Sequence, residues 1–273
     1  MSGCVLCWST GGLFIALLDW HPMTIACIRS GIAALFMAAV RRGALFQRRE
    51  GRAYIFGVPA LAVAAAASAA TKILFVTANK MTAPANAILL QHSAPVWAAL
   101  FARRLTGEEL TGGQRLAVLL GTAGAAVFLF DGLRTGMLAG DGVALLSGLT
   151  FALSMTALRA EKEGSPALAL FFSHLVPAAL GIPFLIIAPP RWTPVSAAAA
   201  LLLGLGQIGA ASLLYAYAIK RLQAVNVMLI AQTEPVLAAL WVFAVTGAAP
   251  SVFALWGGLI IIAAAVAANK GPR

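Results

Sequence analysis

The chain consists of long apolar runs that are separated by short polar turns. A run of roughly 17–25 apolar residues can cross the hydrocarbon core of a bilayer as an α-helix. We therefore predict ten transmembrane helices, near residues 3–18, 22–40, 54–78, 85–103, 114–130, 141–158, 166–188, 195–219, 224–245 and 251–269. Turn-forming residues such as Pro189-Pro190 fall between these runs, and no polar segment is long enough for a soluble domain.

Composition agrees with a lipid environment. Hydrophobic residues make up 61% of the 273 positions, and charged residues make up only 10%. A soluble domain carries roughly a quarter charged residues, which cover its surface. In lipid, each spanning segment satisfies its own backbone hydrogen bonds as a helix. The predicted fold class is therefore an all-α integral membrane protein.

The distribution of basic residues orients the predicted bundle. The net charge is +10, but the basic residues lie between apolar runs and form no stripe of the kind that binds nucleic acid. With the N-terminus inside, fourteen of the 19 Lys and Arg residues fall on the inner side, and Arg29 lies within a helix. The outer loops and the adjoining helix ends receive Lys72, Lys80, Arg134 and Arg191. This bias predicts a multi-pass protein of the plasma (inner) membrane with both termini cytoplasmic, and the lipid bilayer rather than nucleic acid as its partner.

An internal repeat divides the chain into two parts. Residues 86–100 align with residues 226–240, and the two stretches share an Asn, a Pro-Val pair and an Ala-Ala-Leu run. Each copy contains five predicted helices, and an odd number of spans makes the second copy enter from the opposite side. We therefore predict two inverted five-helix repeats, 1–136 and 137–273, an architecture found in many secondary transporters.

Short motifs within the repeat allow a comparison with known families. They are Pro84-Ala85-Asn86-Ala87, Ala94-Pro95-Val96 and Thr106-Gly107 in the first copy, and Ala224-Val225-Asn226, Glu234-Pro235-Val236 and Thr246-Gly247 in the second. With these motifs the chain resembles the drug/metabolite transporter superfamily, specifically its EamA-type ten-helix members. It departs from their pattern after Gly247, where Ala248-Ala249 replaces the usual acidic residue. The resemblance implies a transporter, in a group whose substrates range over amino acids, metabolites and toxic cations.

Polar groups in the second halves of the two repeats are the candidates for a substrate site. Glu234 is the only acidic residue that we predict well inside a helix, and Pro235 follows it, as Pro95 does in the other copy. A proline removes a backbone hydrogen bond, so each repeat is expected to carry a weakened helix near the middle of the membrane. The alternative is a structural kink in which Glu234 pairs with Arg29 or with a backbone group.

Helical spacing adds further candidates. At about 100° per residue, Asn86, Ser93 and Trp97 share one face, and Thr233 lies beside Glu234 on the matching face. The full set of candidate substrate-binding residues is Trp8, Asn86, His92, Ser93, Trp97, Gln207, Tyr215, Gln232, Thr233 and Glu234. Each aromatic or amide side chain could serve packing instead, and His92 fits either role.

Two motifs that suggest a cofactor or a metal lack their usual context. The segment Gly204–Gly209 matches G-x-G-x-x-G, but it lies inside an apolar helix with no preceding strand, where small residues permit close helix contact. Cys4-x-x-Cys7 has no second pair to complete a metal site. We therefore predict no cofactor and no metal.

These observations favour a secondary transporter. We expect it to export small solutes, most of all amino acids or related metabolites, by alternating access at a central cavity between the repeats, with a monomer as the working unit. A multidrug or cation exporter is the alternative substrate class. A membrane-embedded enzyme would need a cluster of nucleophile, base or metal ligands, which the sequence does not contain, so we predict no enzymatic activity. A channel would usually show a filter sequence or a ring of pore-lining charges, and the sequence contains neither.

The charge bias yields a topological prediction. Reporter fusions should place both termini and the 41–52 loop in the cytoplasm, because short loops rich in Lys and Arg are retained there. A C-terminal reporter on the outer side would contradict the predicted even number of spans.

Overall fold

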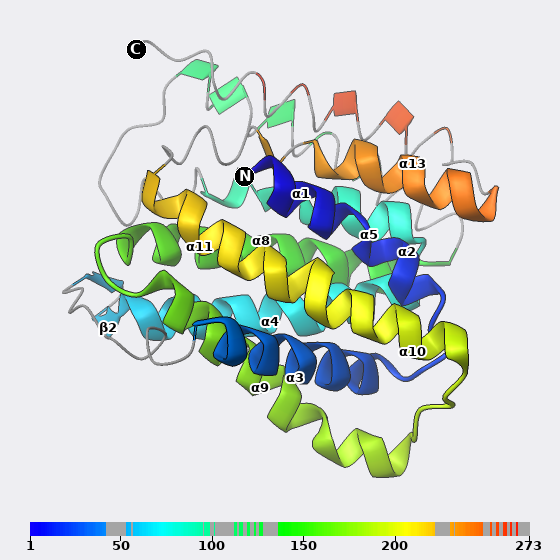
Figure 1. Cartoon of the computed structure of the whole chain (residues 1–273). Coiled ribbons are helices and arrows are strands. Elements are labelled where there is room, and N and C mark those ends of the chain that lie inside the picture. The colour runs from blue at the N-terminus through cyan, green and yellow to red at the C-terminus, as the bar shows by residue number, and fades with distance from the viewer. Residues whose placement is uncertain are drawn as a thin grey trace.

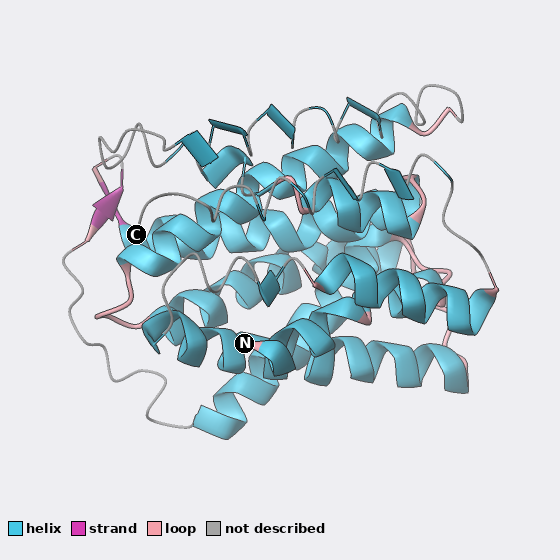
Figure 2. Ribbon diagram, turned by 90° about the horizontal axis from the view of Figure 1, so that it is seen from above, coloured by secondary structure: helices cyan, strands magenta, loops and turns pink. Residues whose placement is uncertain are grey.

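The computed structural model describes residues 1–41, 53–55, 57–94, 96–98, 101, 136–221, 230–231 and 233–247, with isolated positions within 112–127 and 252–266. The described part is a bundle of helices that lie side by side (Figures 1 and 2). Its elements are α1 (Ser2–Ser9), α2 (Gly11–Ala16), α3 (Pro22–Arg41), β1 (Tyr54–Ile55), β2 (Val58–Pro59), α4 (Ala60–Met81), α5 (Pro84–Gln91), α8 (Leu138–Ala160), α9 (Pro166–Ile187), α10 (Pro194–Leu201), the π-helical segment η2 (Leu202–Ala210), α11 (Ala211–Arg221) and α13 (Glu234–Thr246).

Five helical stretches of the described chain are long and apolar enough to cross a membrane. They are Pro22–Arg41, Ala60–Met81, Leu138–Ala160, Pro166–Ile187 and the continuous stretch Pro194–Arg221. Each corresponds to one of the predicted runs. The remaining predicted runs coincide with shorter helices or with residues outside the described part, so the count of ten helices stays a prediction.

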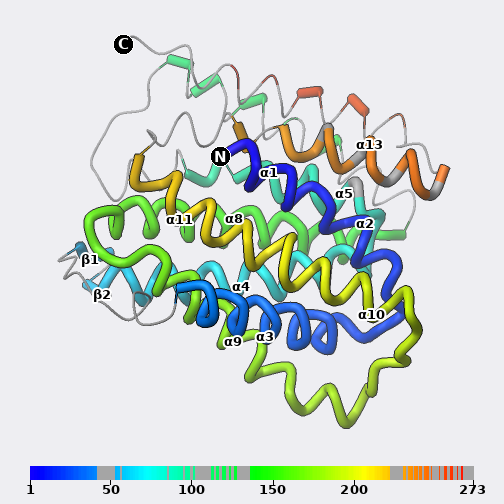
Figure 3. Tube along the Cα trace, viewed as in Figure 1, coloured from blue at the N-terminus to red at the C-terminus, as the bar shows by residue number. Residues whose placement is uncertain are grey.

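The predicted helix at 54–78 begins later than the hydrophobic pattern indicates. Its first residues form an antiparallel hairpin of β1 and β2, which lies at the end of the bundle where α4 begins (Figure 3). Gly57 has a φ of 74° in the turn of this hairpin, a conformation that favours glycine. Pro59 has no N–H to donate and stands just before α4, while the Ala60 N–H donates to the Ala53 carbonyl over 2.8 Å.

The position of Lys72 near the middle of α4 corrects its assignment to an outer loop or helix end. We assigned Lys72 to an outer loop or an adjoining helix end, but it lies within α4, which extends to Met81. Its Nζ donates to the Ser173 hydroxyl over 2.6 Å and to the Ser68 carbonyl over 3.4 Å. Lys72 therefore lies half-buried inside the bundle and not at a helix end.

Loops that the charge bias assigns to one side of the membrane lie together. At one end of the bundle, Lys220 Nζ donates to the Gly164 carbonyl over 3.0 Å, which joins the end of α11 to the α8–α9 turn. At the other end, Trp20 Nε1 donates to the Arg191 carbonyl over 3.0 Å. The structure thus groups these loops as the sequence does, and their assignment to cytoplasm or exterior stays a prediction.

Glycines bring η2 against α3. A Cβ atom added at Gly204 would lie 2.5 Å from Ile32 Cβ, and one added at Gly209 would lie 3.0 Å from Phe36 Cδ1. The G-x-G-x-x-G segment therefore lies in a helical element and serves close helix packing, as we predicted. This contact fixes how α3 faces the interior of the bundle.

We predict that Gly204→Ala lowers the thermal stability of the purified protein. The added methyl meets the rigid Cβ of Ile32, and overpacking of this kind costs about 1–3 kcal/mol. Gly206→Ala is the matched control in the same segment, because a Cβ there meets nothing within 4 Å. Melting in detergent should show a drop for the first variant and none for the second. Equal melting temperatures for both variants would contradict the packing role of Gly204.

Candidate functional site

Two interrupted helices place the polar groups that we singled out. Helix α5 ends at Gln91, and His92 and Ser93 form a turn instead of continuing it. Helix α13 begins at Glu234 with Pro235 in its first turn, a position that tolerates proline because the N–H there has no intrahelical partner. Glu234 therefore lies at the start of a helix and not well inside one, which corrects our prediction.

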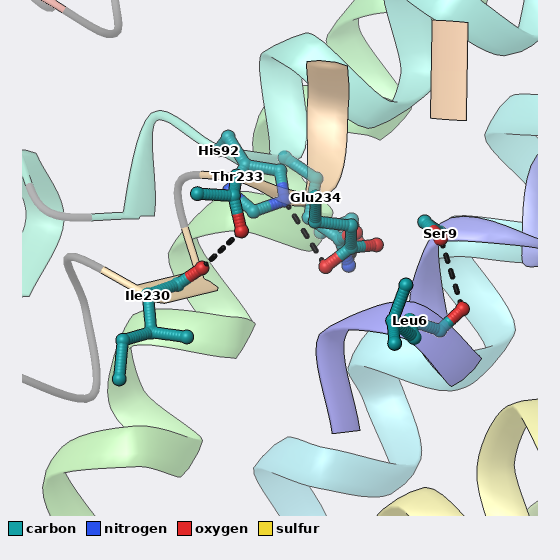
Figure 4. A network of polar contacts seen from close by, with 8 residues as sticks. Leu6, Ser9, His92, Ile230, Thr233 and Glu234 are labelled. Atoms are coloured by element: carbon teal, nitrogen blue, oxygen red, sulfur yellow. Dashed lines mark hydrogen bonds and ion pairs between the residues drawn. The ribbon is translucent and has the colours of Figure 1, made fainter. Parts of the chain in front are cut away.

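His92 and Glu234 contact each other across these two interruptions. His92 Nε2 lies 3.2 Å from Glu234 Oε2, and the two side chains are only 2% and 7% exposed (Figure 4). The partial negative charge at the end of α5 lies near His92, and the partial positive charge at the start of α13 lies near Glu234, so both helix dipoles match the pair. The predicted alternative of a Glu234–Arg29 pair is wrong, because the carboxylate contacts His92.

Arg29 lies in a different set of contacts. Its Nη1 donates to Gln207 Oε1 over 3.2 Å, and its Nη2 donates to the Lys72 carbonyl over 2.9 Å. Gly11 makes room for the Gln207 amide, since a Cβ at Gly11 would lie 2.7 Å from Gln207 Nε2. The guanidinium thereby connects α3 with α4 and η2. Within the described structure, Nε of Arg29 has no hydrogen-bond partner.

A cavity that is partly open to solvent lies between these elements, and its empty space, the open part included, is about 660 Å³. The cavity is lined by Trp8, Arg29, Ser68, Thr71, Lys72, Phe75, Gln91, Phe151, Ser154, Leu170, Gln207, Ile208, Ser212, Tyr215 and Glu234. It therefore combines two basic groups, one carboxylate, two amides, several hydroxyls and four aromatic rings.

The aromatic part of the lining is clustered around Trp8. The Trp8 ring lies 5.9 Å from the Phe151 ring in an edge-on arrangement and 5.3 Å from the Tyr215 ring. The Tyr215 hydroxyl is buried and has no hydrogen-bond partner in the described part of the molecule. Buried hydroxyls normally find a partner, so this group is available to a polar atom of a ligand.

Four of the predicted site residues line the cavity, namely Trp8, Gln207, Tyr215 and Glu234, and His92 contacts one of them. The other candidates lie elsewhere. Trp97 Nε1 donates to Ser93 Oγ over 3.1 Å, and the exposed Thr233 hydroxyl donates to the Ile230 carbonyl over 2.7 Å (Figure 4). Asn86 is buried in α5 but is not part of the lining, and Gln232 lies outside the described residues.

One polar face of α4 lines the cavity, although none of its residues was among the predicted site residues. Ser68, Thr71, Lys72 and Phe75 all line the cavity. Their spacing of three and four residues places them on one helix face, and this spacing is a signal that the sequence already contains.

Membrane-length helices around a cavity with buried charged groups define a multi-pass membrane protein. Comparison with known proteins identifies its family. The model of the EamA-like transporter family matches residues 1–130 and 138–269. The chain belongs to the EamA-like transporter family, and it is therefore a membrane transporter of small solutes.

Solved structures share this fold. Among 25 matching chains, one described as "Crystal structure of protein" is similar with a TM-score of 0.71 and 23% sequence identity. The similarity covers 97% of this chain and 94% of that one. No curated protein sequence matches the chain significantly.

Proposed function

We propose that the protein is a secondary transporter that exports amino acids or related small metabolites through the cavity. The observation that carries the proposal is the lining itself, which comes from both segments matched by the family model. It offers basic groups, a carboxylate and aromatic rings in one space, so a zwitterion with an apolar side chain finds a partner for each of its parts.

The contact between His92 and Glu234 supports alternating access. It joins the turn after α5, in the first matched segment, to the start of α13, in the second. Movement of one repeat against the other must change this contact, since its two partners belong to different repeats. The pair is therefore suited to respond to substrate or to a proton during the transport cycle.

A multidrug or cation exporter is the alternative, and Glu234 is the feature that favours it. A carboxylate in a membrane cavity can bind an organic cation. One observation weighs against it. The lining contains the two basic residues Arg29 and Lys72, which repel a ligand that carries only a positive charge.

Transport in proteoliposomes tests the proposal. A panel of radiolabelled amino acids and organic cations is offered to vesicles that contain the purified protein, and uptake is compared with that of empty vesicles. We expect saturable uptake of one or more amino acids and counterflow when the vesicles are preloaded with the same solute. Uptake restricted to the cations would favour the alternative, and flux without saturation or counterflow would point to a channel.

We predict that Glu234→Gln strongly reduces transport and leaves expression and melting close to wild type. The amide keeps the shape and the hydrogen-bonding capacity of the side chain but loses its charge. Loss of a charge-assisted bond to a substrate amine lowers affinity about ten- to a hundredfold. If Glu234 acts as a proton site instead, wild-type transport will vary with pH and the Gln variant will lose that dependence.

Glu163→Gln is the control for this prediction. Glu163 is an exposed carboxylate whose side chain is 86% accessible, and it lies 3.9 Å from Lys162 Nζ. Transport by this variant should equal that of the wild type. Normal transport by Glu234→Gln at every pH would make Glu234 a structural residue.

A further inference from the structure

The two basic residues of the cavity lack a matching acid. Arg29 and Lys72 both line the cavity, and neither takes part in an ion pair between residues that the structure describes. Glu234 lines the same cavity, but its carboxylate contacts His92. With the three groups charged, the lining carries one more positive charge than negative.

Such an excess is costly at membrane depth. Buried charges in proteins are normally paired, and ionisable residues inside a membrane are rare unless they serve a substrate or an ion. Arg29 is 2% exposed, so water does not compensate its charge. The hydrogen bonds to Gln207 and to the Lys72 carbonyl satisfy part of its guanidinium with neutral acceptors and supply no negative charge.

The surrounding contacts hold both cations in place. Gln207 is seated against Gly11 and orients the Arg29 guanidinium from η2. Ser173 accepts from Lys72 Nζ over 2.6 Å and orients the ammonium from α9. Four elements thus present two cationic groups to one cavity, and Nε of Arg29 still has a hydrogen to donate.

We propose that Arg29 and Lys72 bind the carboxylate of the transported solute. This inference rests on the proposed function and specifies the substrate class as solutes with a carboxylate group and an apolar body. A guanidinium donates two parallel hydrogen bonds to a carboxylate, and a lysine ammonium adds a second positive charge. The rings of Trp8, Phe151 and Tyr215 line the same cavity and provide an apolar surface for the rest of the solute.

Binding to the purified protein in detergent tests the inference separately from transport. The ligands are L-phenylalanine, L-phenylalaninamide, 3-phenylpropionate and phenethylamine, which share one ring and differ in their carboxylate and amine. Binding is measured as stabilisation against heat over a range of ligand concentrations. We expect the two carboxylates to bind the wild type at least tenfold more tightly than the amide and the amine. Binding of 3-phenylpropionate as tight as that of phenylalanine would extend the substrate class from amino acids to simple carboxylic acids.

Three variants complete the test. Lys72→Gln keeps a donor for Ser173 and should weaken binding of the carboxylates about ten- to a hundredfold, with little change for the amide. Arg29→Gln should do the same if it folds, and Lys72→Gln alone decides the matter if it does not. Arg221→Gln is the matched control and should bind like the wild type, because Arg221 is exposed and lies on the Tyr217 ring, outside the cavity lining.

The outcomes separate the inference from the proposed function. The inference is wrong if the wild type binds the amide as tightly as the carboxylates, if none of the carboxylates stabilises it, or if Lys72→Gln binds them normally. Carboxylate binding that depends on Lys72 without transport of any amino acid would leave the inference standing and remove the proposed function. Amino-acid transport that is unchanged in Lys72→Gln would contradict the inference and leave the proposed function standing.

Discussion

A guanidinium in a low-dielectric interior needs acceptors for its hydrogens, and the described bundle supplies them from several directions. A charged residue at the centre of a membrane helix costs about 2.5–3.5 kcal/mol on insertion scales. Arg29 offsets part of this cost by donating to α4 through the Lys72 carbonyl and to η2 through Gln207. These bonds form only when α3, α4 and η2 pack against each other in one relative alignment. The glycine contacts between η2 and α3 allow that approach, so packing and charge satisfaction depend on each other.

The interrupted helices have a related effect on polar groups. A continuous helix hides its backbone, whereas a helix that ends inside the bundle leaves polar backbone groups and a dipole end without a partner. Helix α5 ends before His92 and α13 begins at Glu234, so the two side chains meet where both helix ends lie. A buried acid and a buried histidine are tolerated there because each faces the other and the matching end of a dipole.

The sequence predicted the helical membrane fold and part of the site for identifiable reasons. Run length and hydropathy define the spans α3, α4, α8, α9 and α10–α11, since bilayer thickness sets helix length. The rarity of acids in apolar runs singled out Glu234. Hydropathy did not predict the hairpin at 54–59, because short apolar strands and helices have the same composition. The bond from Arg29 to Gln207 joins residues far apart in the chain, and only the tertiary structure brings them together.

The π-helical segment η2 affects the rotational orientation of the helix that follows it, α11. Residues 202–210 are wound with more residues per turn than an α-helix. The side chains of α11 are therefore rotated about the helix axis, compared with their positions in an uninterrupted α-helix. Removing one residue there would leave hydropathy and charge almost unchanged but would rotate α11 by about 100°. Ser212 and Tyr215 would then turn away from the cavity that they now line. Chain length between Pro194 and Arg221 is thus itself a determinant of what the transporter can hold, independent of residue type.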